Sequence, residues 1–108
     1  MAKIYDVGIA PIRQMAGGTK TVALAGTPEK LVDDSTPCRS VWIGARVDAD
    51  GNPINTKVVF IGDADNQDIP ILPHNFEGVE IAIDDAAKIY VRVGADGEGV
   101  NYRILAGG

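Results

Sequence analysis

Short apolar segments separated by turn-forming residues run through most of this chain. In several of them apolar and polar residues alternate, so that every second side chain falls on the same side of an extended backbone. Gly, Pro, Asn and Asp lie between the segments and interrupt them. The pattern predicts about eight short β-strands, over residues 19–25, 29–32, 38–47, 57–63, 69–72, 77–83, 88–93 and 99–105.

The alternation also predicts which side chains face the interior. In segment 38–47, Trp42 and Arg46 fall on the side opposite the apolar residues, which should form the core face. The same spacing gives core faces to three later segments. The predicted core residues are Val41, Ile43, Ala45 and Val47; Val79, Ile81 and Ile83; Ile89, Val91 and Val93; and Val100, Tyr102 and Ile104.

Turn residues predict how the strands are connected. Asp96-Gly97 stands between two alternating segments, and Gly supplies the positive φ that tight hairpin turns need, so we predict a hairpin joining the last two strands. The one helical candidate, residues 84–88, is too short for more than a single turn.

The first 18 residues have a different pattern. Apolar residues there follow neither the period of a strand nor that of a helix, Pro11 interrupts them, and Gly17-Gly18 closes the segment. We therefore predict an extended N-terminal arm over residues 1–18, packed against its own domain or a neighbour. Residues 19–108 should form one all-β domain, a β-sandwich or a jelly-roll-like barrel.

Composition and charge exclude several classes of partner. The chain has 108 residues, 45% of them hydrophobic, and a formal net charge of -5. An acidic protein has no basic surface with which to neutralise several phosphates, so we expect no nucleic-acid binding. We also expect no membrane partner and no signal peptide, because no apolar run is long enough to span a bilayer and the N-terminus lacks a basic start. Synthesis should take place in a cytoplasm.

Residues that could carry chemistry are scattered. Cys38 stands in a strand-like segment and His74 in a distant loop, so the sequence gives no reason to pair them as nucleophile and base. Acidic loops that begin at Asp48, Asp63 and Asp96 could supply oxygens to calcium. The glutamate that closes an EF-hand loop is missing, however, and Asp, Asn and Gly are ordinary turn residues. We predict no enzyme activity and no cofactor.

Binding to other proteins through the surface is the remaining kind of function. Trp42 faces away from the predicted core, with Arg39 and Arg46 nearby in the sequence, and Trp and Arg are enriched at protein interfaces. Core packing of Trp42 against a second buried face is the alternative. The arm offers a second contact surface, because exposed apolar segments seldom remain uncovered. The candidate interface residues are Ile4, Tyr5, Val7, Ile9, Ile12, Arg13, Met15, Arg39, Trp42 and Arg46.

A series of short motifs runs through residues 19–105. It contains Ala25-Gly26-Thr27-Pro28, Cys38-Arg39-Ser40-Val41, Ile69-Pro70-Ile71-Leu72-Pro73, Lys88-Ile89-Tyr90-Val91 and Asp96-Gly97-Glu98-Gly99-Val100-Asn101-Tyr102. This series resembles a group of small virion proteins of tailed bacteriophages. Asp68 and Glu98 depart from the pattern, because they stand where those proteins have Gly and Asp.

The resemblance implies a module on the exterior of the virion capsid. It favours a head decoration (cement) protein that binds the major capsid protein lattice and stabilises the head. By analogy the chain should also bind copies of itself, as a trimer rather than a dimer. The alternative is a fibre or tail-associated module that binds a receptor or carbohydrate; such a module needs exposed aromatic side chains, and the sequence supplies one Trp, three Tyr and two Phe.

Overall fold

The computed structural model describes residues 12–107, and the side chains of residues 17–106. Each of the eight predicted segments contains part or all of one strand, which confirms an all-β chain, and residues 84–88 contain the helical turn η2 (Ala86–Lys88). The strands are β1 (Ile12–Thr21), β2 (Glu29–Lys30), β3 (Ser40–Ala45), β4 (Val59–Gly62), β5 (Gln67–Ile71), β6 (Val79–Ala82), β7 (Tyr90–Arg92) and β8 (Gly99–Gly107).

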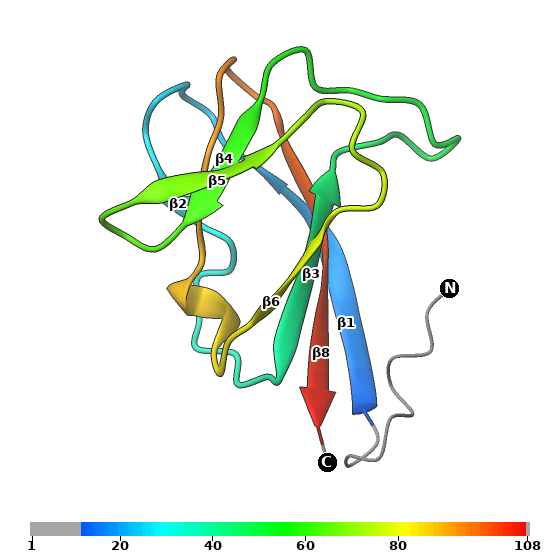
Figure 1. Ribbon diagram of the computed structural model, residues 1–108, viewed down its shortest axis with the longest axis vertical. Coiled ribbons are helices and arrows are strands. Elements are labelled where there is room, and N and C mark those ends of the chain that lie inside the picture. Colours follow the sequence, from blue (N-terminus) through cyan, green and yellow to red (C-terminus); the bar gives the residue numbers. More distant parts are fainter. Residues whose placement is uncertain (1–11, 108) are drawn as a thin grey trace.

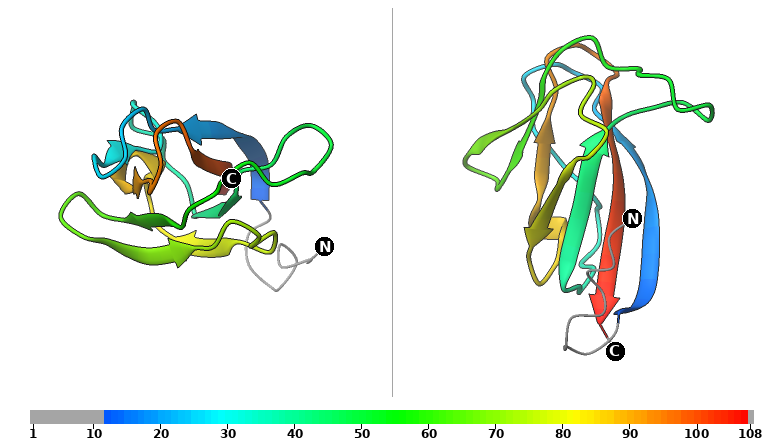
Figure 2. Two further views of the ribbon diagram at one scale, coloured as in Figure 1. Left: turned by 90° about the horizontal axis from the view of Figure 1, so that it is seen from above. Right: turned by 45° about the vertical axis from the view of Figure 1, so that its right-hand side comes forward.

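The strands form two four-stranded sheets that face each other as a sandwich (Figures 1 and 2). The first sheet has the order β1-β8-β3-β6 and the second the order β2-β7-β4-β5. Every pairing is antiparallel, with β1 beside β8, β2 beside β7, β3 beside β6 and β4 beside β5. This nested pairing of first with last is the jelly-roll arrangement of eight strands in two sheets.

The core lies between the two sheets, where the alternation of side chains predicted it. β3 has its apolar side chains on the inner face, while Trp42 lies outside the core cluster. All but one of the predicted core residues are buried in this cluster or packed against it, which confirms the predicted faces; the exception is Val47, which follows the end of β3 and is only partly buried. The buried members are Val22, Leu31, Val41, Ile43, Ala45, Val59, Ile61, Ile71, Ala86, Ile89, Val91, Val93, Val100 and Ile104, with Val79, Ile81, Ile83 and Tyr102 partly buried against them.

The predicted hairpin at Asp96-Gly97 is wrong. A turn is present, and Gly97 has a φ of 81°, but β7 belongs to one sheet and β8 to the other. The turn instead joins the connection that follows β1: Val22 N–H donates to Glu98 O, and Ala25 N–H donates to the Asp96 carboxylate at 2.7 Å. Among the strands of residues 12–107, β4 and β5 are the only two that follow one another in sequence and also pair. Every other connection between these strands crosses from one sheet to the other.

The first strand begins nearer the N-terminus than the sequence predicts. Residues 12–18, predicted to belong to the arm, lie in β1 and pair with β8, from Ile12 beside Gly107 to Gly18 beside Tyr102. A shift of register between Ile12 and Gln14 interrupts the alternation of side chains at the start of this strand. Residues 1–11 lie outside the described part of the chain.

Asp85 joins the loop before β3 to the helical turn before β7. Its carboxylate accepts hydrogen bonds from Ser35 Oγ, from Thr36 N–H at 2.8 Å and from Ala87 N–H at 2.9 Å. The bond from Ser35 and the two backbone bonds stabilise the charged form, and they lower the pKa of Asp85 from 3.8 to about 2. The carboxylate therefore stabilises the fold only while it is ionised.

We expect Asp85→Ala to be less stable than the wild type at pH 7, and this difference to disappear on acidification. Because the folded pKa is about 2 and the unfolded value is 3.8, the contribution of Asp85 is complete above pH 3.8 and is lost as the pH falls through 2. Urea unfolding at a series of pH values measures the difference. Asp34→Ala, at an exposed position in the same region, is the control; a constant difference between wild type and Asp85→Ala down to pH 2 would contradict the assignment.

Candidate binding surface

The outer face of the sheet β1-β8-β3-β6 carries the only tryptophan of the chain. Trp42 lies in β3, directly between Arg103 of β8 and Glu80 of β6, and Gly17 of β1 lies on the far side of Arg103. Since paired residues of neighbouring strands point to the same face, these side chains form one row across the outside of the sandwich. The sequence left open whether Trp42 packs in the core or faces outward. The structure places Trp42 on the outer face, away from the core.

Two glycines make room for the indole ring of Trp42. A Cβ atom at Gly44 would lie 2.7 Å from the ring atoms Cη2 and Cζ2, and one at Gly78 would lie 2.7 Å from Nε1. The ring therefore rests against the backbone at both positions. Its Nε1–H donates a 2.7 Å hydrogen bond to Glu77 O, which fixes the orientation of the ring.

A hollow of about 310 Å³ lies beside this ring, and we call it the Trp42 hollow. Thr19 and Asn101 face each other across β1 and β8, and Thr19 Oγ1 donates to Asn101 Oδ1 at 3.1 Å. The two glycines of β1 contribute no side chains to fill the space. The hollow is lined by Gly17, Gly18, Thr19, Trp42, Asn101, Tyr102 and Arg103.

Arg103 is the one charged residue among the described residues that line the Trp42 hollow. A Cβ atom at Gly17 would lie 2.7 Å from its Cδ, so the aliphatic part of the side chain packs on the bare backbone of β1. The residue is exposed, and no described residue forms a hydrogen bond or ion pair with its guanidinium. A cation in this position can bind an anionic group of a ligand without first losing another partner.

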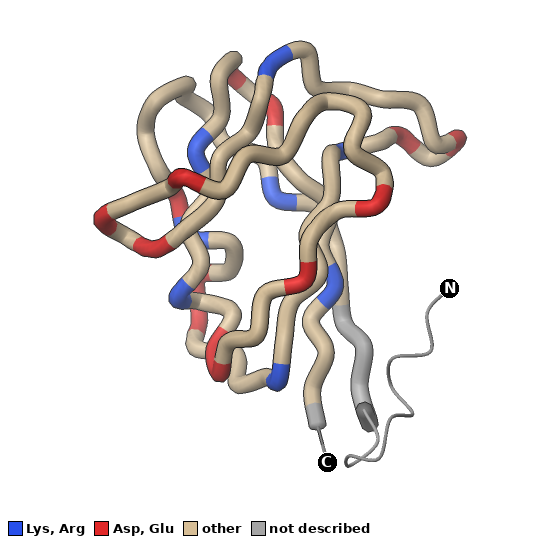
Figure 3. The backbone as a smooth tube through the Cα atoms, viewed as in Figure 1, with Lys and Arg blue, Asp and Glu red and all other residues tan. Residues whose placement is uncertain are grey.

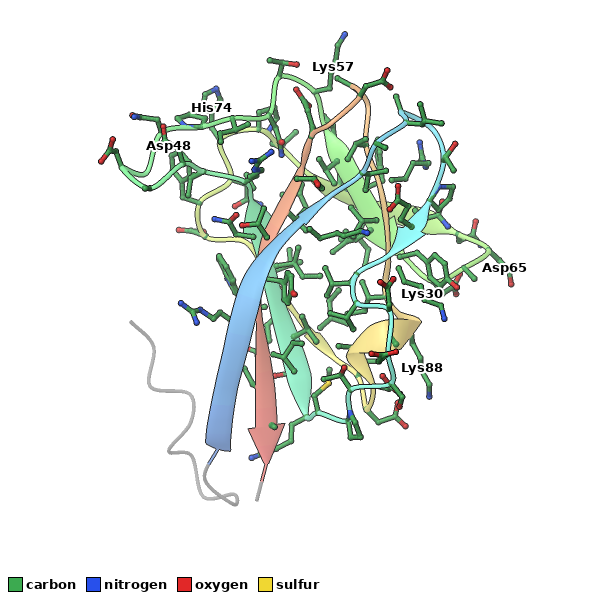
Figure 4. The ribbon with its side chains drawn as sticks, turned by 180° about the vertical axis from the view of Figure 1, so that it is seen from behind. Lys30, Asp48, Lys57, Asp65, His74 and Lys88 are labelled. Carbon is green, nitrogen blue, oxygen red and sulfur yellow. The ribbon has the colours of Figure 1, made fainter. Side chains whose placement is uncertain are left out.

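The loop between β5 and β6 forms a second candidate surface, which we call the apolar loop (residues 72–78). The Leu72 and Phe76 side chains are 57% and 55% exposed, a large fraction for such residues. The ring of His74 meets that of Phe76 edge to face, with 6.4 Å between centroids. Figure 4 shows His74 at the end of the sandwich that also carries Asp48 and Lys57, away from Lys88.

Hydrogen bonds hold the apolar loop in one conformation. Asn75 is central: its N–H donates to Leu72 O at 2.9 Å, its carbonyl accepts from Ala45 N–H at 3.3 Å, and its Oδ1 accepts from Gly78 N–H at 3.0 Å. The bond from Trp42 Nε1 to Glu77 O adds a further attachment to β3. A loop fixed in this way loses little conformational entropy when it binds a partner.

The structure separates the arginines predicted to accompany Trp42. Arg39 and Arg46 lie just outside the two ends of β3, and Arg46 Nη1 donates to Gly97 O at 3.4 Å. The direct neighbours of Trp42 are Arg103 and Glu80, which come from other strands. Of the predicted arm residues, Ile12, Arg13 and Met15 lie in β1, while Ile4, Tyr5, Val7 and Ile9 fall outside the described residues.

Carboxylates in the three loops considered for calcium have structural partners, including Asp96, which accepts from Ala25 N–H. Asp48 accepts from Asp50 N–H and Asn52 N–H at 2.9 Å each, and Asp63 accepts from Asp65 N–H and Asn66 N–H. These are the short-range contacts of aspartate-capped turns. Acidic residues are spread over loops around the molecule (Figure 3), and within residues 12–107 no group of three or more His, Cys, Asp or Glu side chains is arranged to hold a metal ion.

Cys38 is partly buried, and its thiol donates to Ile83 O at 3.2 Å. Burial, followed by the nearby charges of Asp85 and Asp84, raises the pKa of the Cys38 thiol. A raised pKa reduces the thiolate fraction, which is the nucleophilic form. The geometry therefore assigns Cys38 to packing at the edge of the core.

Comparisons with known proteins give no relative from which to transfer a function. No family model, no curated protein and no solved structure matches this chain. Among the helices of the described residues, none has the length and apolar character needed to cross a lipid bilayer.

Proposed function

We propose that this chain is a structural protein of a tailed-bacteriophage virion, a head decoration protein that binds the major capsid protein lattice and stabilises the head. The observation that carries the proposal is the apolar loop, because it presents Leu72 and Phe76 to solvent from a backbone that hydrogen bonds already hold in place. Exposed apolar groups on a pre-organised loop are typical of protein-binding surfaces.

Two further observations support this proposal. Jelly-roll sandwiches are a recurrent architecture of viral capsid proteins, and the nested strand order of this chain is of that kind. The motif Ile69-Pro70-Ile71-Leu72-Pro73, which contributes to the resemblance to phage virion proteins, runs directly into the apolar loop. The proposed contact thus coincides with a segment on which the resemblance depends.

The proposed action is to add contacts across junctions between capsid subunits. Many copies on a symmetric lattice can stabilise a shell even when each contact is small, because linked sites add avidity. We propose a homo-oligomer, with a trimer favoured by analogy with binding at local threefold axes. A trimer would bring three apolar loops to one junction.

Replacing both exposed residues of the loop, as Leu72→Ser with Phe76→Ser, is expected to weaken capsid binding at least tenfold, or about 1.4 kcal/mol. The assay is co-sedimentation of the purified chain with expanded heads that lack it, from the phage that encodes it. Both side chains are exposed, so the fold should persist.

Leu24→Ser is the matched control, since Leu24 is 61% exposed in a different loop. Its binding should stay within twofold of wild type. Shortening the chain by residues 1–11 tests the arm; residues 12–18 must be kept because they form most of β1. Undiminished binding of the double variant would exclude the apolar loop as the contact.

A further inference from the structure

The Trp42 hollow has a fixed aromatic wall. The indole rests on Gly44 and Gly78, and its only polar atom already donates to Glu77 O, so the ring adds aromatic surface to the hollow and no free donor. The face of an aromatic ring is electron-rich and attracts C–H groups that carry partial positive charge. The apolar face of a sugar ring has such C–H groups.

Two other residues that line the hollow supply polar groups that suit hydroxyls. Asn101 and Thr19 both line the hollow and are joined by one hydrogen bond, from Thr19 Oγ1 to Asn101 Oδ1. No described residue accepts a hydrogen bond from the Asn101 amide nitrogen, so both of its N–H donors are available, as are the lone pairs of Thr19. Adjacent donors and acceptors of this kind match vicinal hydroxyls, each of which both donates and accepts.

The charge in the hollow selects among sugars. Within residues 17–106, whose side chains the structure describes, Arg103 is the only charged residue that lines it, on a chain whose net charge is -5. A guanidinium binds a carboxylate through two parallel hydrogen bonds, and this geometry distinguishes it from a simple point charge. A volume of about 310 Å³ is at the small end for ligand pockets, which fits one or two sugar rings.

We propose that the Trp42 hollow binds an acidic saccharide, with a sugar ring packed on Trp42, hydroxyls bonded to Asn101 and Thr19, and a ring carboxylate paired with Arg103. This site goes beyond capsid binding, because the described residues that line the hollow lie in β1, β3 and β8 and none of them belongs to the apolar loop. A decoration protein with such a site would bind acidic glycans through that face.

The test uses the purified full-length chain and intrinsic fluorescence, because Trp42 is its only tryptophan. The probes are D-glucuronate and D-glucose, which share a ring and differ in the carboxylate. We expect a saturable fluorescence change with glucuronate and at least tenfold weaker binding of glucose. Amide chemical shifts of Gly17, Gly18 and Asn101 should move with the same dissociation constant, which locates the ligand.

Arg103→Gln should reduce the affinity for glucuronate to that for glucose. Lys30→Gln removes the same charge from the other sheet (Figure 4) and should leave both affinities within twofold. The proposal is overturned if glucuronate gives no saturable change, if Arg103→Gln binds it like wild type, or if Lys30→Gln weakens it equally. The assay contains no capsid, so its failure leaves the proposed capsid contact standing, and the reverse also holds.

Discussion

Ile43→Ala is expected to lower the free energy of unfolding by about 3–4 kcal/mol, the largest effect of any single substitution considered. Ile43 is fully buried in β3, paired with Tyr102 on one side and Val79 on the other. Truncation removes buried apolar contacts and leaves a cavity that strands paired on both sides cannot collapse to fill. Urea unfolding followed by far-UV circular dichroism measures the loss.

Two controls separate packing from a general effect of substitution. Ile43→Val should cost only about 1 kcal/mol, because it deletes one methylene group. Leu24→Ala, at a side chain that is 61% exposed, should change stability by less than about 0.5 kcal/mol. If Ile43→Ala and Leu24→Ala proved equally mild, β3 could not lie at the centre of the core.

Glu98→Ala is expected to cost about 2–3 kcal/mol, because it removes a buried acceptor used by three donors. The carboxylate accepts from Thr56 N–H and Thr56 Oγ1 at 2.7 Å each and from Lys57 N–H at 3.1 Å, and Glu98 is only 7% exposed. These bonds attach the loop before β4 to the start of β8. Next to them, the Asn55 side chain exchanges two hydrogen bonds with the backbone of Gly99.

The contribution of Glu98 to stability should depend on the ionisation of its carboxylate. Burial raises the pKa of Glu98, but the hydrogen bonds from Thr56 and Lys57 outweigh burial and hold the pKa below the ordinary 4.5. Its contribution is therefore complete above pH 4.5 and decreases as the pH falls through the folded pKa. Glu77→Ala, at an exposed glutamate, is the control for urea unfolding at pH 7. A loss no larger than that of the control would mean that the three donors find other acceptors.

The sequence predicted the strands well because each core face repeats every second residue. Segments such as 89–93 and 100–104 show this alternation with little interruption, and their apolar residues are indeed buried or packed against the core. The pairing of strands could not be predicted in the same way. Asp96-Gly97 has the local chemistry of a hairpin, but the long-range order of the jelly roll sends β7 and β8 to different sheets.

The candidate site could also be predicted only in part, because local alternation is visible in the sequence and long-range strand pairing is not. Alternation alone placed Trp42 on the outer face, as observed. Arg103 lies far from Trp42 in sequence and becomes its neighbour only through the pairing of β3 with β8. The signal that could have pointed to it was the core face of Val100 and Ile104, which implies that residue 103 faces outward.

The glycines that shape the Trp42 hollow could not be assigned from sequence. In the sequence Gly17, Gly44 and Gly78 resemble ordinary turn or bulge residues. In the fold, the Arg103 and Trp42 side chains occupy the space that a Cβ atom at these positions would need. The exposure of Leu72 and Phe76 in the apolar loop could not be predicted from sequence either, because it depends on tertiary contacts of Asn75.

The most direct test of the proposed function is an electron cryo-microscopy reconstruction of the virion that carries this chain. We expect a small two-sheet density on the outside of the head, repeated at junctions of the capsid lattice. In that density the apolar loop should contact the major capsid protein, and the Trp42 hollow should remain uncovered. A head without this density, or the same density on a fibre or tail, would contradict the proposed function.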